Sequence, residues 1–156
     1  MSSRSEVIGR LNGEMQVLIA DAVLRNERIA RTLGLNVVDL QAFGVLARAG
    51  RPLTAGELGQ RTELPSSTTT RVIDRLEKQG LVSRISDPAD RRRVVVQVDH
   101  EQLARISSPA EGSPYAEVSA HMDRVYAGFT LDELEVVARY FAAMNAPTSA
   151  DASAED

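Results

Sequence analysis

The chain has 156 residues, a formal net charge of −4 and only 4% aromatic residues. This length fits one domain. With so few aromatic residues the core must be built from aliphatic side chains, and such a composition suits helices. No apolar run reaches the roughly 20 residues of a membrane span, and the N-terminal residues lack a signal-peptide core, so we expect a cytoplasmic protein. The absence of cysteine excludes disulfides and thiol redox sensing, and the two histidines have no metal-ligand spacing, so no metal or cofactor is expected.

Two helices are predicted at the N-terminal end. Residues 5–33 place apolar side chains at helical spacing, in a stripe that faces either the protein's own core or a partner helix. Gly34 is a typical residue just beyond a helix end. Asn36 and Asp39 have capping-box spacing and predict a second, short apolar helix that ends before Pro52.

The next two helices are also marked by their first residues. "TAGE", residues 54–57, is a capping box that starts a helix reaching about Gln60. Pro65 fits the first position of a helix that extends to Gln79, because its missing N–H costs nothing there. Thr68, Val72, Ile73 and Leu76 are expected to face the core. The other side of this helix carries Ser66, Ser67, Thr69, Thr70, Arg71 and Arg75.

A hairpin and further helices follow. Residues 81–86 and 93–98 are rich in β-branched side chains and flank the turn sequence "DPADR", which predicts two antiparallel strands, or wing. Beyond it we expect a short helix over 99–108, a break at "SSPAEGSP", a helix over 114–128, and a helix that starts at the capping box "TLDE" and ends at Pro147. Residues 147–156 have the composition of a disordered acidic tail.

Positive charge is concentrated in one segment. From Arg61 to Arg93 there are eight basic and five acidic residues, a net of +3, whereas the remainder has ten basic and seventeen acidic residues, a net of −7. An acidic body with one basic segment is typical of nucleic-acid binding.

The order of elements is that of a winged helix-turn-helix: a mostly α fold with a three-helix core and a β-hairpin wing. The helix over 65–79 would enter the major groove, where Arg71 or Arg75 is suited to guanine and the other to a phosphate. The arginines at the hairpin tip are suited to the narrow, negative minor groove, with Asp90 orienting a guanidinium. The plainer alternative is N-capping hydroxyls on a solvated helix face and a charged surface turn.

Residues 36–98, above all "RLEKQGLVSR" followed by "DPADRR", resemble the winged-helix core of the MarR family of bacterial transcription regulators. The resemblance implies a homodimer that binds a pseudo-palindromic operator in double-stranded DNA, usually as a repressor released by a small anionic or phenolic effector. It also implies a set of DNA-contacting residues, in which Asp90 and Arg92 match the family's Asp-x-Arg wing signature. The candidate DNA-binding residues are Thr54, Ser66, Ser67, Thr69, Thr70, Arg71, Arg75, Asp90, Arg91, Arg92 and Arg93.

We therefore predict a DNA-binding domain over 36–98, between an N-terminal dimerisation helix (1–35) and C-terminal dimerisation helices (99–146). If an effector pocket exists, the resemblance places it between the first two helices and the base of the DNA-binding lobe. The first helix carries Arg25, Arg28 and Arg31. These arginines either bind an anionic effector or are charges of the surface and the dimer interface. One alternative is a winged-helix protein-interaction module that does not bind DNA. An enzyme is not expected, because the carboxylates accompany no nucleophile motif, phosphate loop or metal cluster.

Overall fold

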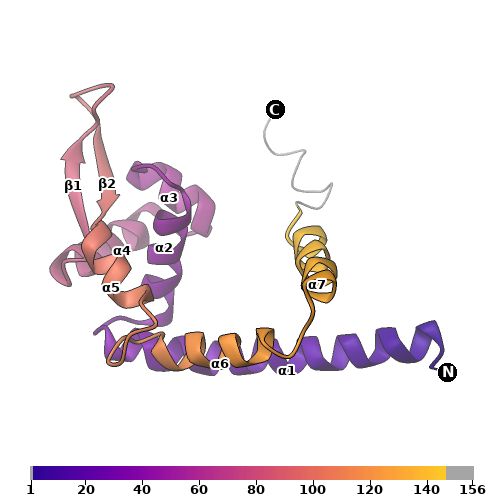
Figure 1. The fold of residues 1–156 in the computed structure, drawn as a ribbon. Coiled ribbons are helices and arrows are strands. Elements are labelled where there is room, and N and C mark those ends of the chain that lie inside the picture. Colours follow the sequence, from indigo (N-terminus) through magenta and orange to yellow (C-terminus); the bar gives the residue numbers. More distant parts are fainter. Residues whose placement is uncertain (1, 147–156) are drawn as a thin grey trace. The chain divides into compact units, whose positions relative to one another are not determined.

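The computed structural model describes residues 2–146, and the chain divides into two compact units between Tyr115 and Ala116. The predicted acidic tail and the helix end at Pro147 lie outside the described residues. The first unit contains, in chain order, α1 (Arg4–Thr32), α2 (Val37–Arg48), α3 (Ala55–Thr62), α4 (Ser66–Lys78), β1 (Val82–Ser86), β2 (Val94–Val98) and α5 (His100–Ser107). This order confirms the winged helix-turn-helix, and Figure 1 shows the β1–β2 hairpin projecting beyond the helices that carry it.

The helix boundaries follow the local signals in the sequence. Asn36 and Thr54 both close capping boxes, each accepting the amide N–H three residues later, from Asp39 at 2.9 Å and from Glu57 at 3.1 Å. Gly34 and Gly80 follow α1 and α4 with φ of 68° and 69°, the left-handed region that favours glycine. Pro65 differs from its prediction: with ψ of 147° it is the residue before α4, not its first helical residue.

The core of the first unit forms where α2, α3, α4 and the hairpin meet. Its fully buried side chains include Leu53, Leu58, Val72, Ile73 and Leu76. The C-terminal turn of α1 joins this core, and so does α5 through Ile106, which is 2% exposed. The compact unit therefore continues past residue 98.

The orientation of α4 differs by one residue from the prediction. Thr69, predicted on the outward side, is 1% exposed, and its hydroxyl donates to the carbonyl of Pro65 at 3.1 Å. Thr68, predicted in the core, is only half-buried. Thr69, Val72, Ile73 and Leu76 have the i, i+3, i+4, i+7 spacing of one helix face, which explains the observed orientation.

The wing is a two-stranded antiparallel sheet in which Val82 pairs with Val98 and Ser86 pairs with Val94. Leu53, just before α3, adds an antiparallel bridge to Val96 through two hydrogen bonds of 2.7 and 3.2 Å. Because Leu53 is also fully buried, this bridge attaches the base of the wing to the helical core.

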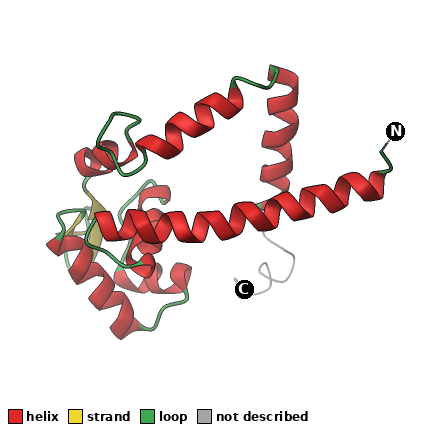
Figure 2. Cartoon of the chain, turned by 90° about the horizontal axis from the view of Figure 1, so that it is seen from below, coloured by secondary structure: helices red, strands yellow, loops and turns green. Residues whose placement is uncertain are grey.

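The second unit contains α6 (Ala116–Tyr126) and α7 (Leu131–Met144). The chain turns sharply between them (Figure 2), and Thr130 closes the predicted capping box of α7 with Glu133. The break predicted at "SSPAEGSP" is confirmed, since no helix covers 108–115. Within residues 2–146 no single helix is long and apolar enough to cross a membrane, and only α1 with α2, bent by 91° between them, meets that test by length and composition.

Candidate nucleic-acid interface

The outer face of α4, defined by the exposed residues Ser66, Ser67, Thr70 and Arg71, points away from the core. Thr70 donates its hydroxyl to the carbonyl of Ser66 at 3.0 Å, a bond within the helix. Arg71 makes no side-chain hydrogen bond or ion pair with any described residue. Four of the six predicted contact residues of this helix therefore share one accessible face, and Thr69 does not.

Arg75 lies at the edge of this face and is held by Asp39 of α2. The Arg75 Nε atom lies 3.0 and 2.9 Å from the two carboxylate oxygens, and Nη2 lies 2.6 Å from Oδ1. Asp39 is completely buried, whereas the Arg75 side chain is 41% exposed. The hydrogen bond to Asp39 raises the pKa of Arg75, so this guanidinium is a fixed charge that Asp39 partly neutralises.

Arg84 of β1 connects the wing to α4. Its guanidinium contacts Asp74 at 2.5 Å and also pairs with Glu77, and its backbone N–H donates to Glu77 at 3.1 Å. Both acidic residues project from exposed positions of α4, where unpaired carboxylates would repel phosphates. Arg84 thus fixes the wing against α4 and offsets one of the two negative charges of Asp74 and Glu77.

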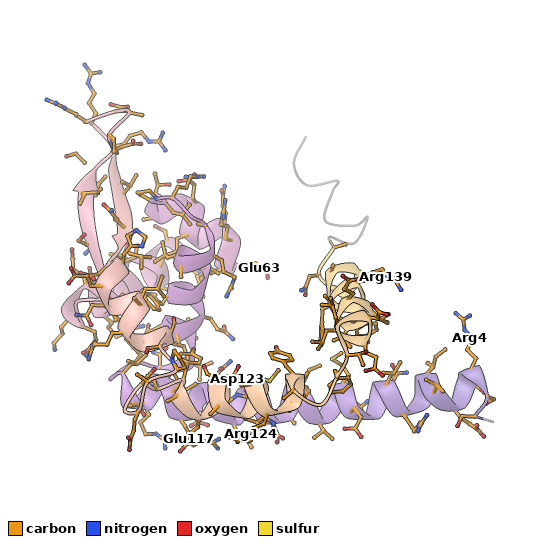
Figure 3. All side chains as sticks on the ribbon, viewed as in Figure 1. Arg4, Glu63, Glu117, Asp123, Arg124 and Arg139 are labelled. Atoms are coloured by element: carbon orange, nitrogen blue, oxygen red, sulfur yellow. The ribbon has the colours of Figure 1, made fainter. Side chains whose placement is uncertain are left out.

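The wing tip carries the three consecutive arginines. Asp90 accepts the backbone N–H of Arg92 at 3.0 Å, so it shapes the turn and does not orient a guanidinium as predicted. Arg93 lies 4.0 Å from Asp87 and is only loosely paired. Arg91 and Arg92 are exposed and have no side-chain partner among residues 2–146. Figure 3 shows nitrogen-bearing side chains spreading outward at this tip.

Thr54 lies at the start of α3, where its hydroxyl is already engaged. It donates to Glu57 at 2.9 Å and accepts the Glu57 amide, while Arg51 binds the same carboxylate at 2.7 Å. Arg51 first, and then the bonds from Thr54, lower the pKa of Glu57 to about 2. The Thr54 hydroxyl therefore has no free proton to donate to a phosphate, and its observed role is to cap the helix.

A cleft of about 620 Å³ lies between α1, α2 and the end of α3, in the region where the resemblance places a pocket. Arg48, Arg61 and Tyr115 contribute polar groups to walls that are otherwise partly apolar, such as Leu40 and Leu64. Burial raises the pKa of the Tyr115 hydroxyl, against the opposing effect of Arg25 and Arg48. Arg31 is instead an exposed surface charge that pairs with Glu27 at 3.1 Å.

Two contacts were not anticipated from the sequence: the Asp39–Arg75 pair and the Arg84 link. Both join residues on different elements, and Asp39 already had a local role at the capping box, so nothing in the pattern indicated a second one. For Arg84, the only available signal was an arginine in a strand directly after a helix with two carboxylates.

Comparison with known proteins agrees with this geometry. A protein-family model with the description "MarR family" matches residues 33–93. The Bacillus subtilis (strain 168) protein named "Uncharacterized HTH-type transcriptional regulator YcgE" is 44% identical over 95 residues. That alignment covers 61% of this chain and 61% of YcgE, less than two thirds of the relative's length.

Solved structures share the fold at lower identity. A MarR family protein from Bacillus stearothermophilus is 22% identical with a TM-score of 0.66, over 92% of this chain and 96% of that one. The YusO protein from Bacillus subtilis is 21% identical with a TM-score of 0.61, over 94% of this chain and 100% of that one. The likeness therefore extends beyond the segment matched by the family model.

Proposed function

We propose that this chain is a MarR family member that regulates transcription by binding specific double-stranded DNA sequences through α4 and the wing, a proposal supported by the family-model match over residues 33–93 and by the likeness to YcgE. One observation carries the proposal. The carboxylates of α4 pair with Arg84, whereas Arg71, Arg91 and Arg92 are exposed and have no side-chain partner among residues 2–146. Arginines on a helix and on an adjacent wing are suited to the major groove and the minor groove, respectively.

The proposed assembly is a homodimer on a pseudo-palindromic operator. Large apolar side chains of α1 are exposed, among them Ile19 and Val23 at 58% each, and α7 exposes Leu131 at 72%. Apolar surface of this kind supports association of the terminal helices with a second copy. A dimer would place two copies of α4 in successive major grooves, roughly 34 Å apart.

We also propose that a small anionic or phenolic effector releases the protein from DNA, and that the DNA-bound protein represses transcription. The cleft beside α2 supports it, because Arg48 and Arg61 offer positive charge and the leucines offer apolar contact. Such a ligand would bind next to the helices that position α4. Salicylate, as a probe, would then weaken DNA binding in the wild type and much less in Arg48→Ala.

The deciding experiment is a salt titration of binding to the DNA upstream of the protein's own gene, with a shuffled duplex as control. We expect specific binding whose log affinity falls steeply with log salt, since each neutralised phosphate contributes about 0.9 to the slope. Arg71→Ala and Arg92→Ala should each weaken binding and reduce the slope by about 1 where the residue contacts a phosphate.

Arg4→Ala is the matched control, because the substitution removes the same charge. Arg4 lies at the far end of α1 from the winged helix (Figure 3). Equal weak binding to both duplexes would move the search to other genomic sites. If no duplex binds even at low salt, DNA binding is refuted and the protein-interaction module takes its place.

A further inference from the structure

We propose that Asp39 is a positioning residue for DNA readout, which holds the Nε–Nη2 side of the Arg75 guanidinium so that the Nη1–Nη2 end meets a guanine in a fixed orientation. The inference rests on the proposed function. It concerns how one arginine of the interface is prepared before DNA binds.

The hydrogen-bond pattern shows which donors of Arg75 are used. Asp39 takes the side of the guanidinium formed by Nε and Nη2, and Nη1 makes no hydrogen bond with any described residue. The planar guanidinium has five N–H groups, so the end formed by Nη1 and Nη2 keeps two parallel N–H groups. This fork matches the two acceptors O6 and N7 of guanine.

Burial shows that Asp39 lies inside the protein while part of the Arg75 side chain is accessible. Asp39 has no exposed side-chain surface, and it is held in place because Asn36 donates its backbone N–H to the Asp39 carboxylate at 3.1 Å. The Arg75 side chain remains 41% exposed. Its position on α4 is one helical turn after Arg71, at the edge of the outer face.

This arrangement gives the two arginines of α4 different properties. Arg71 has no partner among residues 2–146 and must be ordered when DNA binds. Arg75 is already ordered by a bidentate contact with a buried carboxylate, so less conformational entropy is lost when DNA binds. Because the guanidinium is held in one orientation, it cannot move to bind a base in a different position. Fixed donors of this kind contribute to discrimination between sequences more than to total affinity.

The test is Asp39→Asn, with affinities measured for a specific and a shuffled duplex. The substitution keeps the shape but weakens the hold on Arg75 and makes the local charge more positive. We expect the ratio of specific to nonspecific affinity to fall about tenfold, in the range of one bidentate contact, while nonspecific affinity stays the same or rises. Glu101→Gln is the charge-matched control: it removes an exposed carboxylate on α5 and leaves both the Asp39–Arg75 pair and the Arg84 contacts intact.

A double-mutant cycle separates positioning from folding. Arg75→Gln should lower the same ratio, and Asp39→Asn in the Arg75→Gln background should have no further effect on it. Arg75→Lys, at a half-exposed position, supplies a second variant should Asp39→Asn fail to fold. It keeps the charge without the fork, so nonspecific affinity should persist while the ratio falls.

The outcomes distinguish this inference from the proposed function. If the wild type shows no salt-dependent DNA binding, the proposed function fails, and this inference fails with it. If the wild type discriminates between duplexes but Asp39→Asn and Arg75→Lys keep the full ratio, only the positioning role is refuted. Equal loss on both duplexes in Arg75→Gln, with a slope reduced by about 1, would place Arg75 on a phosphate and refute it as well.

Discussion

Gly59 of α3 packs against Thr69 of α4, and it gives the sharpest test of the packing between these two helices. A Cβ atom added at Gly59 would lie 3.1 Å from the hydroxyl oxygen of Thr69 and 3.2 Å from the carbonyl oxygen of Leu64. The same addition at Gly56, in the first turn of the same helix, would meet only the hydroxyl of Thr54, at 3.9 Å. Two Gly→Ala substitutions three residues apart should therefore have opposite signs.

The magnitudes follow from two competing effects. Alanine is favoured over glycine in a helix interior by about 1 kcal/mol, and less in the first turn. Crowding of a packed site typically costs about 1–3 kcal/mol, and here one of the two close contacts is the backbone carbonyl of Leu64, which cannot turn away as the end of a flexible side chain can. We expect Gly59→Ala to lower the free energy of unfolding by about 1 kcal/mol and Gly56→Ala to raise it by about 0.5 kcal/mol.

Urea unfolding at one fixed protein concentration measures both changes, since the stability of an oligomer depends on concentration. Thr69→Ala combined with Gly59→Ala should show favourable coupling, because one of the two close contacts disappears. A Gly59→Ala protein as stable as Gly56→Ala would contradict the tight α3–α4 packing.

Three further outcomes are expected. Glu57→Gln should lower the free energy of unfolding by about 1 kcal/mol at pH 7. Because the pKa of Glu57 is about 2 in the folded protein and 4.5 ordinarily, the difference in stability between wild type and variant should shrink as pH falls from 4.5 through 2. Urea unfolding at each pH measures this difference. Arg84→Ala should weaken DNA binding about tenfold in a salt titration by exposing Asp74 and Glu77 to phosphates, while unfolding changes by less than about 1 kcal/mol. Gly80→Ala should cost about 1 kcal/mol in thermal unfolding from its φ of 69° alone, since no neighbouring atom would clash with a Cβ, and an unchanged midpoint would contradict this.

Features that depend on neighbouring residues were predictable from the sequence. The capping boxes at Asn36, Thr54 and Thr130 formed as expected, because each needs only residues three apart and a helix between them. Gly34 was recognisable for a similar reason, since few other residues adopt the left-handed backbone that ends a helix. The element order of the winged helix followed from these local signals.

Features that depend on orientation within α4 were predicted less well. Thr68, Thr69 and Thr70 are identical in chemistry, so the sequence pattern alone could not decide which threonine faces the core. The tertiary contact decides it: Thr69 fits against Gly59, where only a small residue leaves room. The same limit applies to Arg75, whose partner Asp39 lies 36 residues away in the chain.

The pairing of charges explains how an acidic protein presents a basic surface. Counting charges by segment gives only +3 between residues 61 and 93, with five carboxylates among the arginines. The structure shows that Asp74 and Glu77 are bound by one arginine of the wing, and that the buried Asp39 binds only one side of Arg75. Arg75 and Arg84 each offset one negative charge, and each of these contacts also fixes an element beside α4. The effective charge of this surface is therefore set by which arginines remain unpaired, and among them Arg71 lies on the outer face of α4 and Arg91 and Arg92 lie at the wing tip.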